Sequence, residues 1–141
     1  MTSPPSPPSS GTPRAIMRVA MAAFFTAGGI AHIMTPDPFL AITPDWVPFP
    51  REVVFATGLL EIAGSIALMT PRLRWLAGVM LALYALSVWP ANFKHAIEHI
   101  SLPPVPDSWW YHGPRLALQP VIMWWALFCA DVIDWPFGRR A

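Results

Sequence analysis

Four long apolar stretches alternate with shorter polar or proline-containing segments along the chain. They cover residues 15–34, 53–70, 73–93 and 115–133. At a rise of about 1.5 Å per residue, about 20 helical residues cross a hydrocarbon layer about 30 Å thick. The pattern therefore predicts an all-α integral membrane protein, a four-helix bundle that forms one domain at residues 15–135.

The segments at the two ends of the chain lack the apolar side chains that a core needs. Residues 1–14 are rich in proline and serine, which predicts a disordered tail, and residues 136–141 are expected to form a short basic C-terminal tail. Loops are expected at 35–52 and 94–114. A cleaved signal peptide is the alternative for the first apolar stretch, but the further apolar stretches favour a membrane span.

The composition agrees with a membrane setting. Hydrophobic residues make up 55% of the chain and charged residues only 12%, too few to solvate a soluble globule of 141 residues. The formal net charge of +1 provides no basic surface for phosphates, so nucleic acid is not an expected partner. The single cysteine, Cys129, excludes an internal disulfide and a Cys-x-x-Cys pair, so a redox role would need an electron carrier from elsewhere.

The distribution of lysine and arginine predicts the orientation in the bilayer. Six cations lie on the side of the termini: Arg14, Arg18, Arg72, Arg74, Arg139 and Arg140. Three lie on the side of the two long loops: Arg51, Lys94 and Arg115. By the positive-inside rule, both termini of this multi-pass protein are expected to be cytoplasmic. The loop aromatics suit an interfacial belt, with ligand stacking as the alternative: Trp46, Trp109, Trp110 and Tyr111.

Glu61 is the acidic side chain inside the second apolar stretch. It lies about 12 Å along that helix, near the middle of the hydrocarbon, where an acidic residue costs roughly 2.5 to 3.5 kcal/mol. We therefore expect it to face the bundle interior and to meet a polar group of another helix, most of all Arg115, Gln119 or Asn92, directly or through water. It is either a proton acceptor or ligand anchor, or a protonated side chain that only joins two helices.

Other polar residues can reach the same interior from the outer ends of the helices. His32 follows Gly28 and Gly29 by about one turn, while Arg115 and Gln119 lie four residues apart on one helical face. We interpret these residues as the lining of an outer cavity with Glu61 at its floor; interfacial hydrogen bonding is the alternative. The candidate catalytic residues are Glu61 and His32, and the candidate ligand-binding residues are Asn92, Arg115, Gln119 and Trp89.

Residues 94–99 contain the His-x-x-Glu-His spacing of an inverted zinc-protease motif. On one helical face, His95 and His99 would supply two ligands, whereas a catalytic zinc needs three from the protein. Only His112 or Asp107 offers a third. No metal is assigned, and His95 and His99 are kept as candidate ligands against the alternative of solvated interfacial residues.

Five short motifs, in order along the chain, resemble the DoxX family of small four-helix membrane proteins. They are Gly29-Ile30-Ala31-His32, Pro44-Asp45-Trp46-Val47-Pro48, Gly58-Leu59-Leu60-Glu61, Trp89-Pro90-Ala91-Asn92 and Arg115-Leu116-Ala117-Leu118-Gln119. The resemblance covers about residues 15–128. Trp89 stands where the family more often has Phe, and Ala117 where it often has Pro, with Pro120 nearby.

The resemblance implies a bacterial inner-membrane protein with four spans. The family is named after a subunit associated with thiosulfate:quinone oxidoreduction, and relatives are linked to oxidoreductases and oxidative-stress responses. Its recurrent polar positions fall here on His32, Glu61, Asn92, Arg115 and Gln119.

The leading hypothesis is a membrane component of a redox system that binds a small lipophilic molecule, such as a quinone, and acts with a partner oxidoreductase. Arg115 and Gln119 would donate hydrogen bonds to carbonyl oxygens, Asn92 and His32 would orient the ring, and Glu61 would relay a proton. Two alternatives stay open: a membrane-embedded isomerase or cyclase with Glu61 as acid and His32 as base, and an assembly subunit that binds no ligand.

Overall fold

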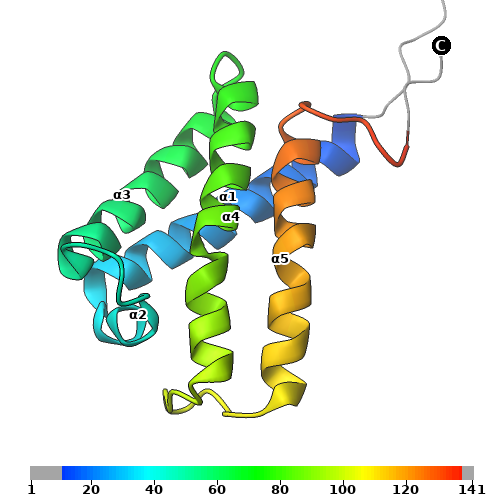
Figure 1. Ribbon diagram of the computed structural model, residues 1–141. Helices are drawn as coiled ribbons and strands as arrows, with labels where there is room; N and C mark the ends of the chain where they lie inside the picture. The colour runs from blue at the N-terminus through cyan, green and yellow to red at the C-terminus, as the bar shows by residue number, and fades with distance from the viewer. Residues whose placement is uncertain (1–10, 138–141) are drawn as a thin grey trace, which may run out of the picture.

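The computed structural model describes residues 11–137, and the regular secondary structure in this range is helical. Figure 1 shows the helices in chain order: α1 Gly11–Met34, α2 Asp37–Ile42, α3 Pro50–Met69, α4 Arg74–Ile97 and α5 Trp109–Cys129. No strand occurs among these residues, where Leu102 and Val105 form only an isolated bridge. The expected all-α fold is confirmed.

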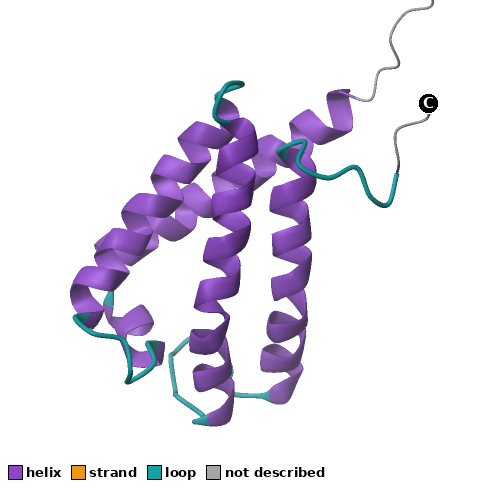
Figure 2. Ribbon diagram, turned by 45° about the horizontal axis from the view of Figure 1, so that its top comes forward, coloured by secondary structure: helices purple, strands orange, loops and turns teal. Residues whose placement is uncertain are grey.

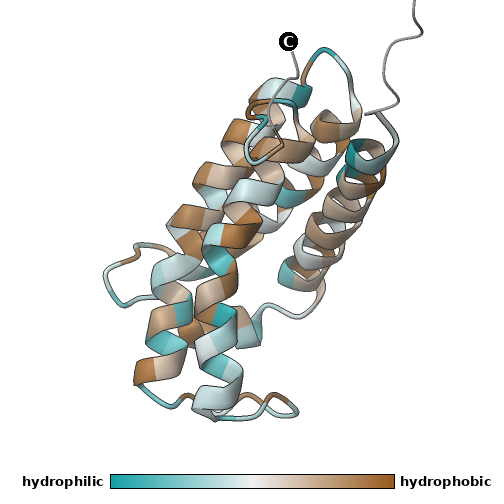
Figure 3. Cartoon of the chain, turned by 90° about the vertical axis from the view of Figure 1, so that its right-hand side faces the viewer, coloured by the Kyte–Doolittle hydropathy of each residue, from teal (hydrophilic) through white to brown (hydrophobic). Residues whose placement is uncertain are grey.

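Three helices of the described range, α1, α3 and α4, are long and apolar enough to cross a membrane. α5 has 21 residues, but its tryptophan, proline, histidine, arginine and glutamine side chains lower its mean hydropathy. Many large apolar side chains are exposed, in agreement with the brown positions on the helix surfaces in Figure 3. Such a surface is typical of helices that face lipid. The chain is thus compatible with a membrane protein, and three of the four expected spans meet this test.

The long helices form two pairs that converge at one end and spread apart at the other (Figure 1). α1 packs mainly against α3, and α4 packs mainly against α5. α3 also contacts α4, and α1 also contacts α5. The short helix α2 lies at the wide end, where it contacts α3 and α4 (Figure 2).

Small residues allow the pairs to converge at the narrow end. A Cβ atom on Gly78 of α4 would collide with Ala130, just after α5. Trp125 Nε1 donates to the Met17 carbonyl oxygen over 3.0 Å, which ties α5 to α1. The buried core of this region consists mostly of small and aliphatic residues: Met21, Phe25, Leu68, Ala77, Leu81, Ala82, Ala126, Cys129 and Ala130.

α1 begins earlier than the apolar pattern predicts. Residues 11–14, expected in the disordered tail, form its first turn, while residues 1–10 of that tail lie outside the described range. Arg14 fixes this turn because its guanidinium group lies 2.7 Å from both Asp131 and Asp134 and 4.2 Å from the centre of the Phe128 ring. Tertiary contacts therefore order a segment whose composition alone favours disorder.

The other boundaries also differ from the prediction. α4 continues through Pro90 to Ile97, beyond the expected end at residue 93. α5 begins at Trp109, where the Ser108 side chain accepts a hydrogen bond from the N–H of Trp110 and caps the helix. It ends at Cys129, before the expected end at residue 133. α2 lies within the expected loop at 35–52, and residues 138–141 of the predicted C-terminal tail lie outside the described range.

Candidate functional site

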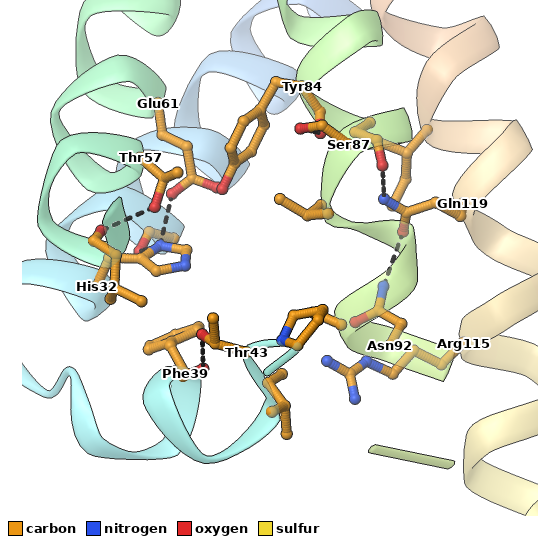
Figure 4. Close-up of a pocket in the computed structure, with 18 of the residues that line it drawn as sticks. His32, Phe39, Thr43, Thr57, Glu61, Tyr84, Ser87, Asn92, Arg115 and Gln119 are labelled. Carbon is orange, nitrogen blue, oxygen red and sulfur yellow. Dashed lines mark hydrogen bonds and ion pairs between the residues drawn. The ribbon is translucent and has the colours of Figure 1, made fainter. Parts of the chain in front are cut away.

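A cavity of about 800 Å³ opens between the two helix pairs. All five helices of the described range contribute to its walls, together with Thr43, Pro44, Trp46 and Val47 after α2. Much of the lining is apolar, including Phe25, Ile42 and Val88, and the volume lies within the range of small-molecule sites, about 300 to 1,000 Å³. Figure 4 shows polar side chains on two facing walls.

The first polar group lies on the wall made by α1 and α3. Glu61 is only 6% exposed, and its Oε2 atom lies 2.9 Å from Nδ1 of His32. The same nitrogen lies 3.0 Å from the carbonyl oxygen of Gly28, which can only accept a hydrogen bond. We therefore assign the proton to Nδ1, which leaves Nε2 facing the cavity (Figure 4). Tyr84 of α4 also lines the cavity, with its hydroxyl turned toward Glu61 (Figure 4).

Two glycines bring His32 and Glu61 together. Gly29 of α1 and Gly58 of α3 face each other so closely that a Cβ on Gly29 would lie 2.5 Å from the Gly58 carbonyl oxygen. A Cβ on Gly58 would lie 2.9 Å from Cβ of His32. Glycine thus lets the two backbones approach, as small residues do at other membrane helix crossings. Phe39 of α2 stacks on the His32 ring, with the ring centres 3.8 Å apart.

The second polar group lies on the wall made by α4 and α5. Asn92 Nδ2 donates to Gln119 Oε1 over 3.2 Å, and the Gln119 amide nitrogen donates to the carbonyl oxygen of Ala85. Gln119 is buried, so both ends of its amide have partners inside the protein. The arrangement joins α4 to α5 and leaves the carbonyl oxygen of Asn92 able to accept a further hydrogen bond.

Arg115 lies on the same wall. Its Nη1 atom donates to Nδ1 of His95 over 2.6 Å, and its guanidinium carbon lies 5.8 Å from the centre of the Tyr111 ring. Glu61 meets His32 instead of Arg115. The prediction that Glu61 faces the interior and meets a polar group of another helix is therefore confirmed. The prediction of a direct hydrogen bond to Arg115, Gln119 or Asn92 is wrong, because these three side chains have other partners.

A row of histidines continues from Arg115 toward the surface. The His95 ring lies 4.7 Å from the ring of buried His112, whose Nε2 donates to Asp107 over 3.2 Å. Exposed His99 contacts the same Asp107 oxygen at 3.1 Å. Removal from water acts to raise the pKa of Asp107, but the hydrogen bonds from His112 and His99 outweigh it and hold this pKa below its ordinary value.

His95 and His99, the two candidate metal ligands, do not lie on one helical face. α4 ends at Ile97, and His99 has a φ of 50°, in the left-handed region, so the helical register that would align the two histidines is broken. His95 is buried beside Arg115, whereas His99 is exposed. Within residues 11–137, no group of three or more histidine, cysteine or acidic side chains could hold a metal ion.

The cavity brings together five predicted site residues and leaves one outside. The five are His32, Glu61, Asn92, Arg115 and Gln119, and their chemical roles stay predictions. Trp89 is not part of the lining; its ring packs against Phe93 with the centres 5.5 Å apart.

The lining residues that were not predicted include Phe39, Thr43, Thr57 and Tyr84. The sequence contains a feature that could have indicated Tyr84 and another that could have indicated Thr57. Tyr84 is one of only two tyrosines and interrupts an apolar stretch, and Thr57 lies one turn before Glu61. Phe39 and Thr43 depend on α2, which the apolar pattern does not predict.

Comparisons with known proteins place the chain in a family. No curated protein matched the chain, and neither did any solved structure. A family model described as a domain of unknown function (DUF8561) matches residues 21–130, which include all the predicted site residues. Because this match covers more than half of the sequence, the chain belongs to the DUF8561 family.

Proposed function

We propose that the chain is a multi-pass protein of the bacterial inner membrane that binds a small lipophilic molecule, such as a quinone. In this proposal it is a DoxX-like membrane component of a redox or oxidative-stress system, and a partner oxidoreductase supplies the electrons. One observation carries the proposal: an apolar cavity of about 800 Å³ has hydrogen-bonding side chains on two facing walls.

The membrane arrangement rests on helix lengths and charges. α5 packs along α4 and would complete a four-helix bundle with the three apolar spans. Arg14, Arg18 and Arg74 gather around Asp131 at the narrow end. By the positive-inside rule this end, with both termini, would face the cytoplasm. The cavity, at the wide end, would then lie in the outer half of the bilayer.

A quinone suits this cavity because its ring is apolar and its two carbonyl oxygens point in opposite directions. In the quinol form, one hydroxyl would donate to Nε2 of His32, while the oxygen on the opposite side would approach the wall of Asn92 and Arg115, where N–H groups can donate hydrogen bonds. Apolar side chains between the walls would surround the ring and its tail.

Conversion of a quinol to a quinone releases two electrons and two protons. His32 can accept a hydroxyl proton at Nε2 while Nδ1 passes its own proton to Glu61, and reduction would use the same path in reverse. The second proton would follow after Glu61 has given the first to water. The electrons would go to the partner, because Cys129 is the only thiol of the chain and is buried.

Quinone binding by the purified chain in nanodiscs tests the proposal. Titration with a short-tailed naphthoquinone should quench tryptophan fluorescence in a saturable manner. Glu61→Leu should weaken binding, whereas Glu61→Gln should retain it and slow proton-coupled turnover with the partner. Glu98→Gln makes the same chemical change at an exposed position and should alter neither. If no quinone binds saturably, the proposal is wrong.

A membrane-embedded isomerase or cyclase is the second candidate, because a buried carboxyl group beside a histidine is an acid–base pair. The hydrogen bond between Glu61 and His32 places both on one wall, which favours a single proton relay over two groups acting from opposite sides. Turnover of an unsaturated lipid without an oxidoreductase would favour this candidate. For an assembly subunit without a ligand, Glu61→Gln would leave the assembled complex fully active.

A further inference from the structure

The charge of Arg115 indicates the chemical class of the ligand. We propose that the cavity takes an amphiphile with an acidic headgroup, whose negative charge pairs with Arg115. This inference rests on the proposed function, because it narrows a small lipophilic ligand to an anionic one.

Arg115 differs from the other cations of the described residues. Arg14, Arg18, Arg74 and Lys94 are partly buried, and each lies within 4.0 Å of an aspartate. Arg51 and Arg72 are exposed and can be solvated by water. Of the lysines and arginines in residues 11–137, Arg115 is the one that is neither exposed nor paired with a carboxylate.

His95 holds the guanidinium group in place without neutralising it. Arginine has only donors and stays protonated in proteins, so Nδ1 of His95 must accept the hydrogen bond of 2.6 Å. His95 is only 2% exposed, so the protein holds its ring in place. With Nδ1 accepting, the imidazole is neutral. It therefore fixes the position of the guanidinium group and leaves the positive charge available to the cavity.

The acidic residue of the cavity lining does not supply the missing negative charge. Glu61 lies on the facing wall, where it is paired with His32 at 2.9 Å. Asp107 is paired with His99 and His112. A cation in an apolar cavity is unfavourable unless an anion or water pairs with it, and a guanidinium group matches the two oxygens of a carboxylate. A headgroup that brings such oxygens would complete the ion pair.

Binding of paired probes to the full chain in phosphatidylcholine nanodiscs tests this inference. One pair is an alkylated hydroxynaphthoquinone, an enolate at mildly alkaline pH, and its neutral methoxy analogue. The other pair is laurate and dodecanol. We expect each anion to bind about 10- to 100-fold more tightly than its neutral counterpart, the range typical of a charge-assisted hydrogen bond. Competition by phosphatidylglycerol in the nanodisc would identify a membrane lipid as the source of the headgroup; absence of competition would identify a free amphiphile.

Three variants assign the preference to Arg115. Arg115→Gln should remove it, and Arg115→Lys should retain part of it, because lysine restores the charge but not the planar pair of donors. Arg72→Gln removes a charge at an exposed position in the turn after α3 and should leave the preference unchanged. Thermal unfolding of each variant verifies that the variant is folded, so that a lost preference for anions can be assigned to the missing side chain.

Two results would overturn the inference and leave the proposal of quinone binding intact. One is equal affinity for the anion and its neutral analogue, and the other is a preference for anions that persists in Arg115→Gln. A different result would contradict the proposed quinone binding and support the anionic site. If laurate binds in an Arg115-dependent manner and neither naphthoquinone binds, the anionic site stands and the quinone part of the proposed function is wrong.

Discussion

The carboxyl group of Glu61 is buried among apolar helices without a permanently charged partner. An acidic residue at such a depth costs roughly 2.5 to 3.5 kcal/mol, whereas one hydrogen bond returns only about 1 kcal/mol. More than one donor is therefore needed to hold it there. His32 at 2.9 Å supplies one, and Tyr84, which lines the same cavity, has a hydroxyl that can supply another. The stability of this part of the protein should therefore depend on His32 and Glu61 together.

Coupling between His32 and Glu61 can be measured with a double-mutant cycle. His32→Ala should lower the free energy of unfolding by about 1 to 3 kcal/mol, because it removes a donor from a buried carboxyl group. In a Glu61→Leu background, His32→Ala should lower the free energy of unfolding by a clearly smaller amount, since no carboxyl group is left unpaired. Chemical denaturation in detergent micelles gives both values. Equal costs in the two backgrounds would contradict a coupled pair.

The sequence predicted that Glu61 faces inward, because the energetic argument depends only on its depth in an apolar helix. It did not predict His32 as the partner, because depth measured along each helix ignores helix tilt. α1 crosses behind the other helices at a steep angle (Figure 1), and Gly29 and Gly58 let it approach α3. Arg115 was misassigned for a related reason: α4 extends past residue 93 and brings His95 next to it.

At the scale of helices, the crossing of α1 and α3 sets the position of the first polar wall. Gly29→Ala should destabilise the protein by about 1 to 3 kcal/mol, because the new Cβ would lie 2.5 Å from the Gly58 carbonyl oxygen. Gly113→Ala is the matched control, since a Cβ there meets no atom within 4 Å. It should be neutral, or stabilising by up to about 1 kcal/mol through helix propensity. A Gly29→Ala variant as stable as Gly113→Ala would mean that α1 and α3 do not cross as described.

α2 is the element that the sequence did not predict. It has only six residues, too few for a helical repeat to stand out, and its position depends on contacts with residues far along the chain. Lys94 of α4 donates to the Thr43 carbonyl oxygen over 2.9 Å and lies 2.7 Å from Asp45. These contacts hold the segment after α2 over the cavity.

Lys94→Met should therefore loosen the segment that follows α2. Hydrogen exchange of residues 37–47 is expected to accelerate, because two contacts that fix this segment disappear. Residues 21–30 of α1 should exchange as before. Arg51→Met, which removes an exposed cation from the start of α3, serves as the control and should change neither region. Unchanged exchange at 37–47 in Lys94→Met would show that other contacts hold the segment.

At the scale of the whole molecule, the chain ends of the described range meet at the narrow end. Arg14, near the start of α1, pairs with Asp131 and Asp134, just after α5. The sequence predicted this shared side from four apolar stretches, each of which would reverse the chain direction. The ion pairs could not be predicted, because they join residues 117 and 120 positions apart. They hold α5, the long helix that is not among the three apolar spans, in the placement that a fourth span would need.

Thiol labelling tests both the fourth span and the orientation. In a Cys129→Ser background, single cysteines would replace three exposed residues: Arg72, Ser101 and Phe137, the last 73% exposed. If α5 crosses the membrane and the narrow end is cytoplasmic, an impermeant maleimide should label only the Ser101 variant in intact cells. The other two should react after lysis. External labelling at both 101 and 137 would mean that α5 does not cross, because its two ends would lie on one side. Labelling at 72 and 137 alone would keep the four spans and reverse the orientation, since the arginines of the narrow end would then lie outside.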